Sequence, residues 1–176
     1  TQSANFYWQM RDMNTNDIIV TRLAAQNGFL GVITLNRPQT LNALTHEMIQ
    51  RLSQQLDVWL LDADVKAILI ESSSEKAFCA GGDILSIYQA KQNNELRPAF
   101  FQDEYALNQQ IHHYPKPIIA FLDGITMGGG VGLSVHASHR VGTEKMIWAM
   151  PETGIGFFTD VGGSYFLSRC PQQMGV

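Results

Sequence analysis

The chain has 176 residues, of which 45% are hydrophobic and 16% are charged, so it has enough apolar side chains for one globular domain with a buried core. Twelve basic and sixteen acidic residues give a formal net charge of −4, and the Lys and Arg residues are scattered along the chain. This composition excludes a disordered tail, and we expect no nucleic acid partner.

The N-terminal part begins with a polar and aromatic stretch and continues into a hairpin. Residues 1–17 have neither the basic region nor the apolar core of a signal peptide, and we interpret them as an N-terminal extension. The β-branched runs 18–23 and 29–35 are separated by a segment that contains Asn27-Gly28. Because Asn-Gly is a strong hairpin signal, two antiparallel strands should open the domain.

The middle of the chain alternates between strand and helix patterns. Thr45 is the expected N-cap of a helix over 45–61, where apolar residues recur at helical spacing. Residues 65–71 form an expected strand, and 84–89 a short helical stretch. A second long helix is expected over 98–113, before two nearby prolines.

The C-terminal part continues this alternation with shorter elements. An apolar strand at 117–122 leads into a glycine-rich turn at 123–130 and a buried helical turn at 131–136. Val141 and residues 146–150 are expected to form a short hairpin or strand pair. Strands that alternate with helices after an opening hairpin predict an α/β fold, a sheet covered by helices.

The predicted elements form one domain over 18–176. No apolar run approaches the roughly 20 residues of a membrane helix, so we expect no membrane association. A helix begins near Gly162 and the chain stops soon afterwards, which predicts that a C-terminal helical part is missing.

Two glycine-rich turns, Ala80-Gly81-Gly82-Asp83 and Met127-Gly128-Gly129-Gly130, each follow a predicted strand and lead into a predicted helix. Glycine lets a ligand approach the backbone, and the N–H groups that begin a helix favour negative charge. Two such turns that face one another can each donate an N–H to one carbonyl oxygen, the requirement of thioester chemistry. The alternative is that these glycines merely close tight turns.

Three carboxylates lie in apolar surroundings. Glu104 interrupts an apolar stripe of the helix over 98–113, so it either faces a polar cavity or reaches solvent at the edge of the stripe. Glu152 and Asp160 lie in one apolar, glycine-rich loop. Such surroundings raise the pKa of a carboxyl group and suit it to acid–base or nucleophilic work, although Asp160 could instead cap the helix at Gly162.

The histidines and cysteines are assigned no catalytic or metal-binding role. His112 and His113 end a helix, where a cationic group is favourable in any case, and the other histidines lack metal-ligand spacing. Cys79 is expected to be a small core residue. With Cys170 it forms neither a disulfide framework nor a zinc motif, so we expect no metal and a reducing compartment.

Several segments resemble the enoyl-CoA hydratase/isomerase, or crotonase, superfamily, in the order of that family. They are Leu35-Asn-Arg-Pro38, Leu41-Asn-Ala-Leu44, Lys76-Ala-Phe-Cys-Ala-Gly-Gly-Asp83, Met127-Gly-Gly-Gly130 and Pro151-Glu152. Within the superfamily, the branch that hydrolyses 3-hydroxyisobutyryl-CoA is similar over 101–108, 124–136, 149–153 and 160–163.

This resemblance implies a crotonase fold of repeated ββα units and a thioester carbonyl held by the N–H groups of Gly82 and Gly129. Their neighbours Gly81 and Gly128 would contact the substrate. Hydratases of the superfamily carry a glutamate where this chain has Gly132, so the two-carboxylate addition of water loses one partner here. The hydrolase branch is therefore favoured over the hydratases.

The same resemblance assigns roles to the three carboxylates. Glu152 would attack the thioester or activate a water, Asp160 would orient the 3-hydroxyl group or the water, and Glu104 would complete a polar wall of the substrate site. Coenzyme A would enter only as part of the substrate, without a separate cofactor. The segment Phe157-Phe158-Thr159 replaces the more usual Leu-Phe-Pro of the branch, so the resemblance does not define the shape of the pocket.

Two other functions stay open at this point. An enoyl-CoA hydratase or isomerase with a rearranged acid would act on the same class of thioester, and a non-catalytic acyl-CoA-binding scaffold would keep only the fold. The resemblance implies a cytoplasmic location in a bacterium or the mitochondrial matrix in a eukaryote, and it leaves self-association open.

Overall fold

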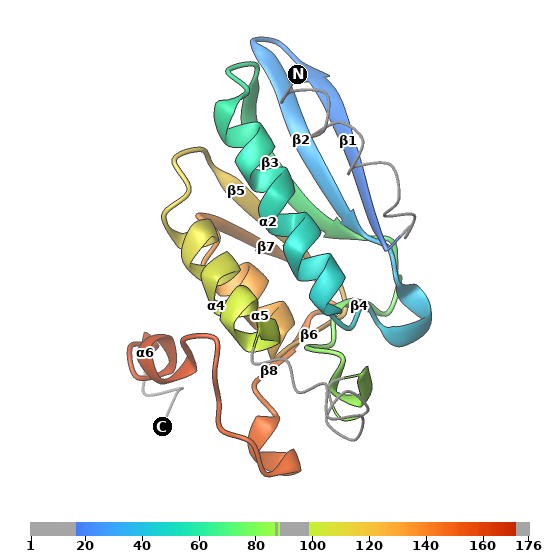
Figure 1. The fold of residues 1–176 in the computed structure, drawn as a ribbon, viewed down its shortest axis with the longest axis vertical. Helices are drawn as coiled ribbons and strands as arrows, with labels where there is room; N and C mark the ends of the chain where they lie inside the picture. The colour runs from blue at the N-terminus through green and yellow to red at the C-terminus, as the bar shows by residue number, and fades with distance from the viewer. Residues whose placement is uncertain (1–16, 87, 89–98, 172–176) are drawn as a thin grey trace, which may run out of the picture.

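The computed structural model describes residues 17–86, 88 and 99–171 (Figure 1). The predicted extension 1–17 lies outside the described residues, apart from Asp17. Of the predicted helical stretch 84–89, residues 84–86 are described together and are helical.

The chain opens with the expected antiparallel hairpin. Strand β1 (Ile18–Ala25) pairs with β2 (Gly28–Leu35), and Ala25 lies opposite Gly28 at the closed end. Gly28 has a φ of 139°, which a residue with a side chain rarely adopts. The hairpin predicted from Asn27-Gly28 is therefore confirmed.

The described strands form two sheets of unequal size, and the hairpin belongs to the larger one. The larger has the order β1-β2-β3-β5-β7. The pair β1–β2 is antiparallel, and the pairs β2–β3, β3–β5 and β5–β7 are parallel. Its remaining strands are β3 (Val65–Ser72), β5 (Ile118–Leu122) and β7 (His139–Gly142). The smaller sheet is parallel throughout and contains β4 (Ala77–Cys79), β6 (Ile125–Met127) and β8 (Ile147–Ala149).

The chain repeats one unit: β3, β5 and β7 each pass directly into the next strand of the smaller sheet, and a helix follows. This is the repeated ββα arrangement that the family resemblance implied. The helices of the fold are α2 (His46–Leu61), α4 (Ala99–His112), α5 (Gly129–Val135) and α6 (Gly163–Leu167), with short 3-10 turns at Pro38–Thr40 (η1) and Glu152–Ile155 (η2).

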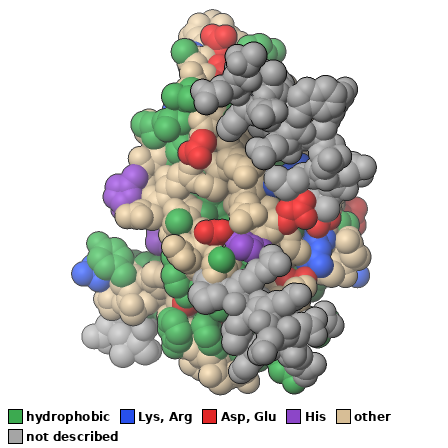
Figure 2. Space-filling view, in the orientation of Figure 1, with side chains coloured by type: hydrophobic (Ala, Val, Ile, Leu, Met, Phe, Trp, Pro, Cys, Tyr) green, Lys and Arg blue, Asp and Glu red, His purple; other side chains and the backbone are tan. Residues whose placement is uncertain are grey.

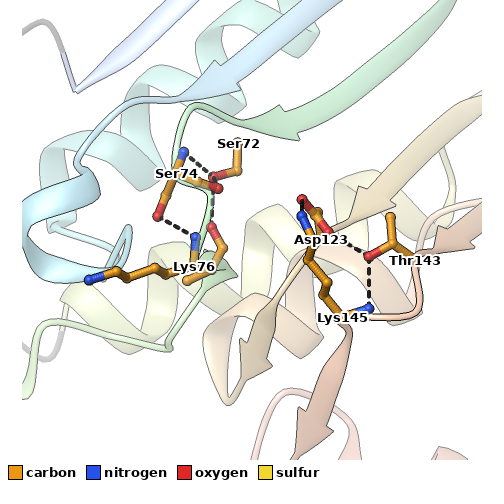
Figure 3. Close-up of polar contacts among 7 residues, drawn as sticks. Ser72, Ser74, Lys76, Asp123, Thr143 and Lys145 are labelled. Atoms are coloured by element: carbon orange, nitrogen blue, oxygen red, sulfur yellow. Dashed lines mark hydrogen bonds and ion pairs between the residues drawn. The ribbon is translucent and has the colours of Figure 1, made fainter.

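Polar side chains fasten the points where the chain crosses from one sheet to the other (Figure 3). Between β3 and β4, Ser72 Oγ accepts from the Ser74 N–H at 2.8 Å and Ser74 Oγ accepts from the Lys76 N–H at 3.2 Å. Thr143, at the crossing from β7 to β8, donates its hydroxyl to Asp123, at the crossing from β5 to β6, over 2.5 Å. The serine contacts stabilise one crossing, and the bond from Thr143 to Asp123 joins two neighbouring crossings.

The structure corrects two predictions for the shorter strands. The predicted glycine-rich turn at 123–130 contains strand β6, because three residues are too few to show a strand period. The predicted hairpin from Val141 and residues 146–150 is wrong: β7 and β8 lie in different sheets, parallel to β5 and β6. Each strand pairs with its counterpart in the preceding unit, and that pairing has no local sequence signal.

Helices α2 and α4 lie side by side over one face of the larger sheet (Figure 1). Thr45 caps α2 as expected, since its hydroxyl accepts from the Met48 N–H at 3.1 Å. Trp59 is 1% exposed and packs where Gly31 of β2 leaves room, because a Cβ at Gly31 would lie 2.7 Å from the indole. Each fully buried large side chain of this kind stabilises the fold by about 2 kcal/mol.

On the face shown in Figure 2, the described Lys and Arg side chains are separated from one another and intermixed with Asp and Glu. None of the helices that the structure describes is both long enough and apolar enough to cross a membrane.

Candidate active site

The first glycine turn follows β4 and is held by the segment between β2 and α2. The Leu44 N–H donates to the Gly81 carbonyl at 2.8 Å, and the Asp83 N–H donates to the Leu44 carbonyl at 2.9 Å. These bonds form the bridge between Leu44 and Gly82 without using the N–H of Gly82 itself. Gly81 has a φ of 115°, a conformation open mainly to glycine.

Arg37 and Asn42, which belong to the family-like motifs before α2, hold this segment in place through hydrogen bonds and an ion pair. Asn42 is fully buried with a φ of 55°, and its amide donates to Ser72 Oγ at 2.7 Å and to the Phe78 carbonyl at 3.0 Å. Its side-chain oxygen accepts from the Arg37 N–H at 2.7 Å, and the Arg37 guanidinium pairs with Asp83 at 2.9 Å. The family-like motifs before α2 therefore position the first glycine turn.

The second glycine turn joins β6 to α5 and lies against the first. Gly128 is the N-cap of α5, so the N–H of Gly129 belongs to the first helical turn and has no partner within the helix. A Cβ on Gly129 would lie 3.5 Å from the N atom of Gly82, and one on Gly81 would lie 3.8 Å from the N atom of Gly129. The two turns are thus side by side, the arrangement that a shared oxyanion site requires.

The carboxylates of Glu104 and Glu152 lie close to the backbone of the second glycine turn. A Cβ on Gly129 would lie 2.5 Å from Glu104 Oε1, and a Cβ on Gly128 would lie 2.9 Å from Glu152 Oε1. Even an alanine at either position would displace a carboxylate. The glycines therefore do more than close tight turns, because they admit these side chains to the backbone.

One cavity of about 340 Å³ joins these parts. All of the candidate residues predicted from the sequence line it, together with aromatic and aliphatic side chains. Its lining consists of Ala80, Gly81, Gly82, Ile84, Phe100, Phe101, Glu104, Gly128, Gly129, Pro151, Glu152, Gly154, Ile155, Phe157 and Asp160.

Glu104 projects from α4 and is 4% exposed, so the prediction that it could reach solvent at the edge of the stripe is wrong. Burial raises the pKa of its carboxyl group to about 8, and the nearby negative charges of Asp160 and Glu152 act in the same direction. At neutral pH this side chain is therefore mainly the neutral acid, which can donate a hydrogen bond.

Glu152 begins the short 3-10 turn η2 and is 9% exposed. Burial raises the pKa of its carboxyl group, and the charge of Asp160 adds to that effect. Its Oε2 atom is buried and accepts no hydrogen bond from the described residues. A carboxylate oxygen in this state is a better base and nucleophile than a solvated one.

Asp160 is half-buried and accepts a hydrogen bond from the Tyr105 hydroxyl at 2.9 Å. Burial raises the pKa of Asp160, and this hydrogen bond opposes the rise. The helix-capping alternative is not found, because the N-cap of α6 is Gly162 and no side chain caps that helix. The Asp160 backbone carbonyl, rather than its side chain, accepts from the Gly163 N–H at 2.7 Å.

Tyr105 and the aromatic wall were not anticipated. Tyr105 and Asp160 are 55 positions apart, and no motif links them. Phe157 stacks on Phe101 at a ring-centroid distance of 5.6 Å, which closes one side of the cavity. Only the unusual aromatic pair at 157–158 hinted at such a wall.

The remaining reactive side chains lie outside the site or are inert. Cys79 is completely buried, and burial raises the pKa of its thiol to about 12. His46 pairs with Asp103 at 2.7 Å on the outer side of α2 and α4. Within the described ranges, no three His, Cys, Asp or Glu side chains are grouped so that they could hold a metal ion.

A family model for enoyl-CoA hydratase/isomerase matches residues 30–176. The chain belongs to this family. Among solved structures of the family's fold, an enoyl-CoA hydratase from Rhodobacter sphaeroides is 39% identical with a TM-score of 0.83, over 91% of this chain and 47% of that one. A carnitinyl-CoA dehydratase from Mycobacterium thermoresistibile is 44% identical with a TM-score of 0.83, over 92% and 46%.

Curated relatives in the enoyl-CoA hydratase/isomerase family carry a hydrolase name. The mitochondrial 3-hydroxyisobutyryl-CoA hydrolase of Danio rerio is 55% identical over 150 residues, 85% of this chain and 39% of that protein. The human enzyme of the same name is 52% identical over 154 residues, 87% and 40%. The chain thus spans about two fifths of the length of these curated relatives.

Gly132 stands where the resemblance places one of the two glutamates of a hydratase. It lies in α5, where a Cβ would meet the Asn108 side chain at 2.9 Å and Val161 at 3.0 Å. A larger side chain has no room unless Asn108 moves. Among the described residues that line the cavity, the carboxylates are those of Glu104, Glu152 and Asp160.

Proposed function

We propose that the protein hydrolyses a short 3-hydroxyacyl-CoA thioester, with 3-hydroxyisobutyryl-CoA as the substrate and 3-hydroxyisobutyrate and coenzyme A as products. The observation that carries this proposal is the meeting of two glycine N–H donors and three buried or half-buried carboxylates in one cavity. The curated relatives of that name support the choice of acyl group. Coenzyme A enters as part of the substrate.

Gly82 and Gly129 are the oxyanion donors in this proposal. The thioester oxygen accepts one N–H from each turn and gains negative charge as the carbonyl carbon becomes tetrahedral. Each donor contributes on the order of 3 kcal/mol to the stability of that intermediate. Gly81 and Gly128 let the acyl group approach the backbone.

Glu152 supplies the group that opens the thioester. Its carboxylate either adds to the carbonyl carbon, expels the coenzyme A thiolate and forms an anhydride that water then cleaves, or takes a proton from a water that adds directly. In both routes one water is consumed and one thiol is released. The proximity of Glu152 Oε1 to the second glycine turn supports both routes equally.

Asp160 and Glu104 bind the polar groups of the acyl chain. Asp160, held by Tyr105, accepts a hydrogen bond from the 3-hydroxyl group or from the water. Glu104, as a neutral acid, donates a hydrogen bond to an oxygen of the bound acyl group or its intermediate. The stacked Phe101 and Phe157 rings form an apolar wall for the hydrocarbon part of the acyl group.

The test is the variant Glu152→Gln in the full-length protein, assayed for thiol release from 3-hydroxyisobutyryl-CoA. We expect loss of hydrolysis by a factor on the order of 10³ or more with acyl-CoA affinity nearly unchanged, because the amide keeps the shape but neither attacks nor accepts a proton. The exposed Glu144→Gln is the matched control and should retain full activity. Full hydrolytic activity of Glu152→Gln would refute the assignment. A non-catalytic scaffold would bind the acyl-CoA and release no thiol in either the wild type or the variant.

A hydratase is the second candidate, since the two solved structures above carry hydratase and dehydratase names. The crowding at Gly132 opposes it, because no further carboxylate fits beside Asn108. The mitochondrial names of the curated relatives support the mitochondrial matrix as the location if the source is a eukaryote, and the cytoplasm otherwise. Self-association stays a prediction.

A further inference from the structure

The backbone next to Asp160 has an uncommon conformation. Val161 has a φ of 43° and Gly162 a φ of 87°, so two successive residues lie in the left-handed region. Glycine adopts it freely, but a β-branched residue does so only when its surroundings hold it there. Val161 is 3% exposed, so those surroundings are the packed interior.

His136 supplies the polar contact that holds this conformation. Its Nε2 atom lies 2.8 Å from the Val161 carbonyl oxygen, and because a carbonyl can only accept, Nε2 carries the proton. The ring also packs against Gly162, where a Cβ would lie 3.1 Å from His136 Cε1. One imidazole therefore fixes both residues that follow Asp160.

The position of His136 connects two parts of the site. It is the C-cap of α5, the helix whose first residue is Gly129. The same short helix thus presents an oxyanion donor at one end and holds the Asp160 loop at the other. Tyr105, on α4, donates a hydrogen bond to the Asp160 carboxylate. The position of that carboxylate therefore depends on this bond and on the backbone of Asp160 and Val161.

We propose that His136 is a positioning residue, which sets the place of the Asp160 carboxylate relative to the Gly129 N–H through the Val161 carbonyl. This inference rests on the proposed function of Asp160. His136 touches no reacting atom in it, and His112, whose ring lies edge-on at 6.0 Å, buttresses the imidazole.

The test compares His136→Phe, which keeps a ring but removes the donor, with His136→Gln, whose Nε2 amide can still donate to the Val161 carbonyl. In the full-length protein we expect His136→Phe to lower kcat for thioester hydrolysis about 10- to 100-fold while KM changes less than about three-fold, since small misplacement of a catalytic group costs rate before binding. His136→Gln should recover most of the loss. His139→Phe, an exposed histidine on β7, is the control for the substitution itself.

Asp160→Asn separates this inference from the proposed function. If Asp160→Asn abolishes hydrolysis and His136→Phe keeps the wild-type kcat, the positioning role is wrong and the proposed function stands. If Asp160→Asn is fully active, both the proposed function of Asp160 and the positioning role of His136 fail. In the double variant, losses that fail to multiply support action through Asp160, and losses that multiply contradict it. If His136→Phe does not fold, His136→Leu takes its place under the same criteria.

Discussion

The cavity carboxylates Glu104, Glu152 and Asp160 carry the proposed chemistry, and the burial of Glu104 links the stability of the fold to pH. Their apolar setting could be inferred from sequence, because Glu104 interrupts an apolar stripe and Glu152 and Asp160 share an apolar loop. Their mutual proximity could not, since it is set by the packing of α4 against the second glycine turn and the loop before α6.

Glu104→Gln should change the pH dependence of stability. The folded protein raises the pKa of Glu104 from 4.5 to about 8, so it binds a proton more tightly than the unfolded chain. Stability from this group is fully present below about pH 4.5 and is lost as the pH rises through about 8, by a few kcal/mol at most. Urea unfolding at about pH 5 and about pH 8 measures the loss, which the Gln variant should lack. Equal pH slopes in the two proteins would contradict the buried state of Glu104.

Tyr105→Phe should act through Asp160. The hydroxyl stabilises the ionised carboxylate and so lowers its pKa, and removing it lets that pKa rise further. We expect kcat/KM to fall about 10-fold and its acid limb to move to higher pH, as measured in a pH–rate profile of thioester hydrolysis. An acid limb at the wild-type position would show that Tyr105 only packs against Asp160.

At the scale of elements, the local patterns were reliable and the pairings were not. Asn27-Gly28 predicted the hairpin, and Thr45 with the helical period predicted α2. The short strands β6 and β8 went unrecognised or were paired wrongly, because their partners lie in the preceding ββα unit. Arg37 and Asn42 were read only as a family motif, and their role in bracing the first glycine turn emerged from the fold.

Gly129→Ala tests the close approach of α4 to the second glycine turn. The new Cβ would lie 2.5 Å from Glu104 Oε1 and 3.1 Å from Leu44 Cδ1, so the carboxylate and the turn must separate. We expect thioester hydrolysis to fall by a factor on the order of 10². Gly154→Ala is the matched control, because it lines the same cavity but its Cβ would meet nothing within 4 Å. Unchanged activity of Gly129→Ala would mean that the turn tolerates a side chain, and an equal loss in Gly154→Ala would mean that the loss does not come from the contact with Glu104.

At the scale of the whole molecule, each ββα unit contributes one piece of the site. The first glycine turn, the second glycine turn and the loop with Glu152 and Asp160 each follow a strand of the smaller sheet, β4, β6 and β8. The parallel sheet therefore brings the three segments together at the C-terminal ends of its strands, and α4 contributes Glu104 and Tyr105. The sequence shows the two glycine turns as a repeated pattern and the loop with Glu152 and Asp160 as a separate feature, while the convergence of the three segments depends on the sheet.

Hydrolysis and hydration of an acyl-CoA give different products, so a product assay distinguishes the proposed hydrolase from a hydratase. The full-length protein should be incubated with 3-hydroxyisobutyryl-CoA and, separately, with crotonyl-CoA, while free thiol and the enoyl absorbance are followed. We expect rapid thiol release from 3-hydroxyisobutyryl-CoA that depends on Glu152, with little loss of the crotonyl double bond. Loss of that double bond without thiol release from either substrate would contradict this expectation.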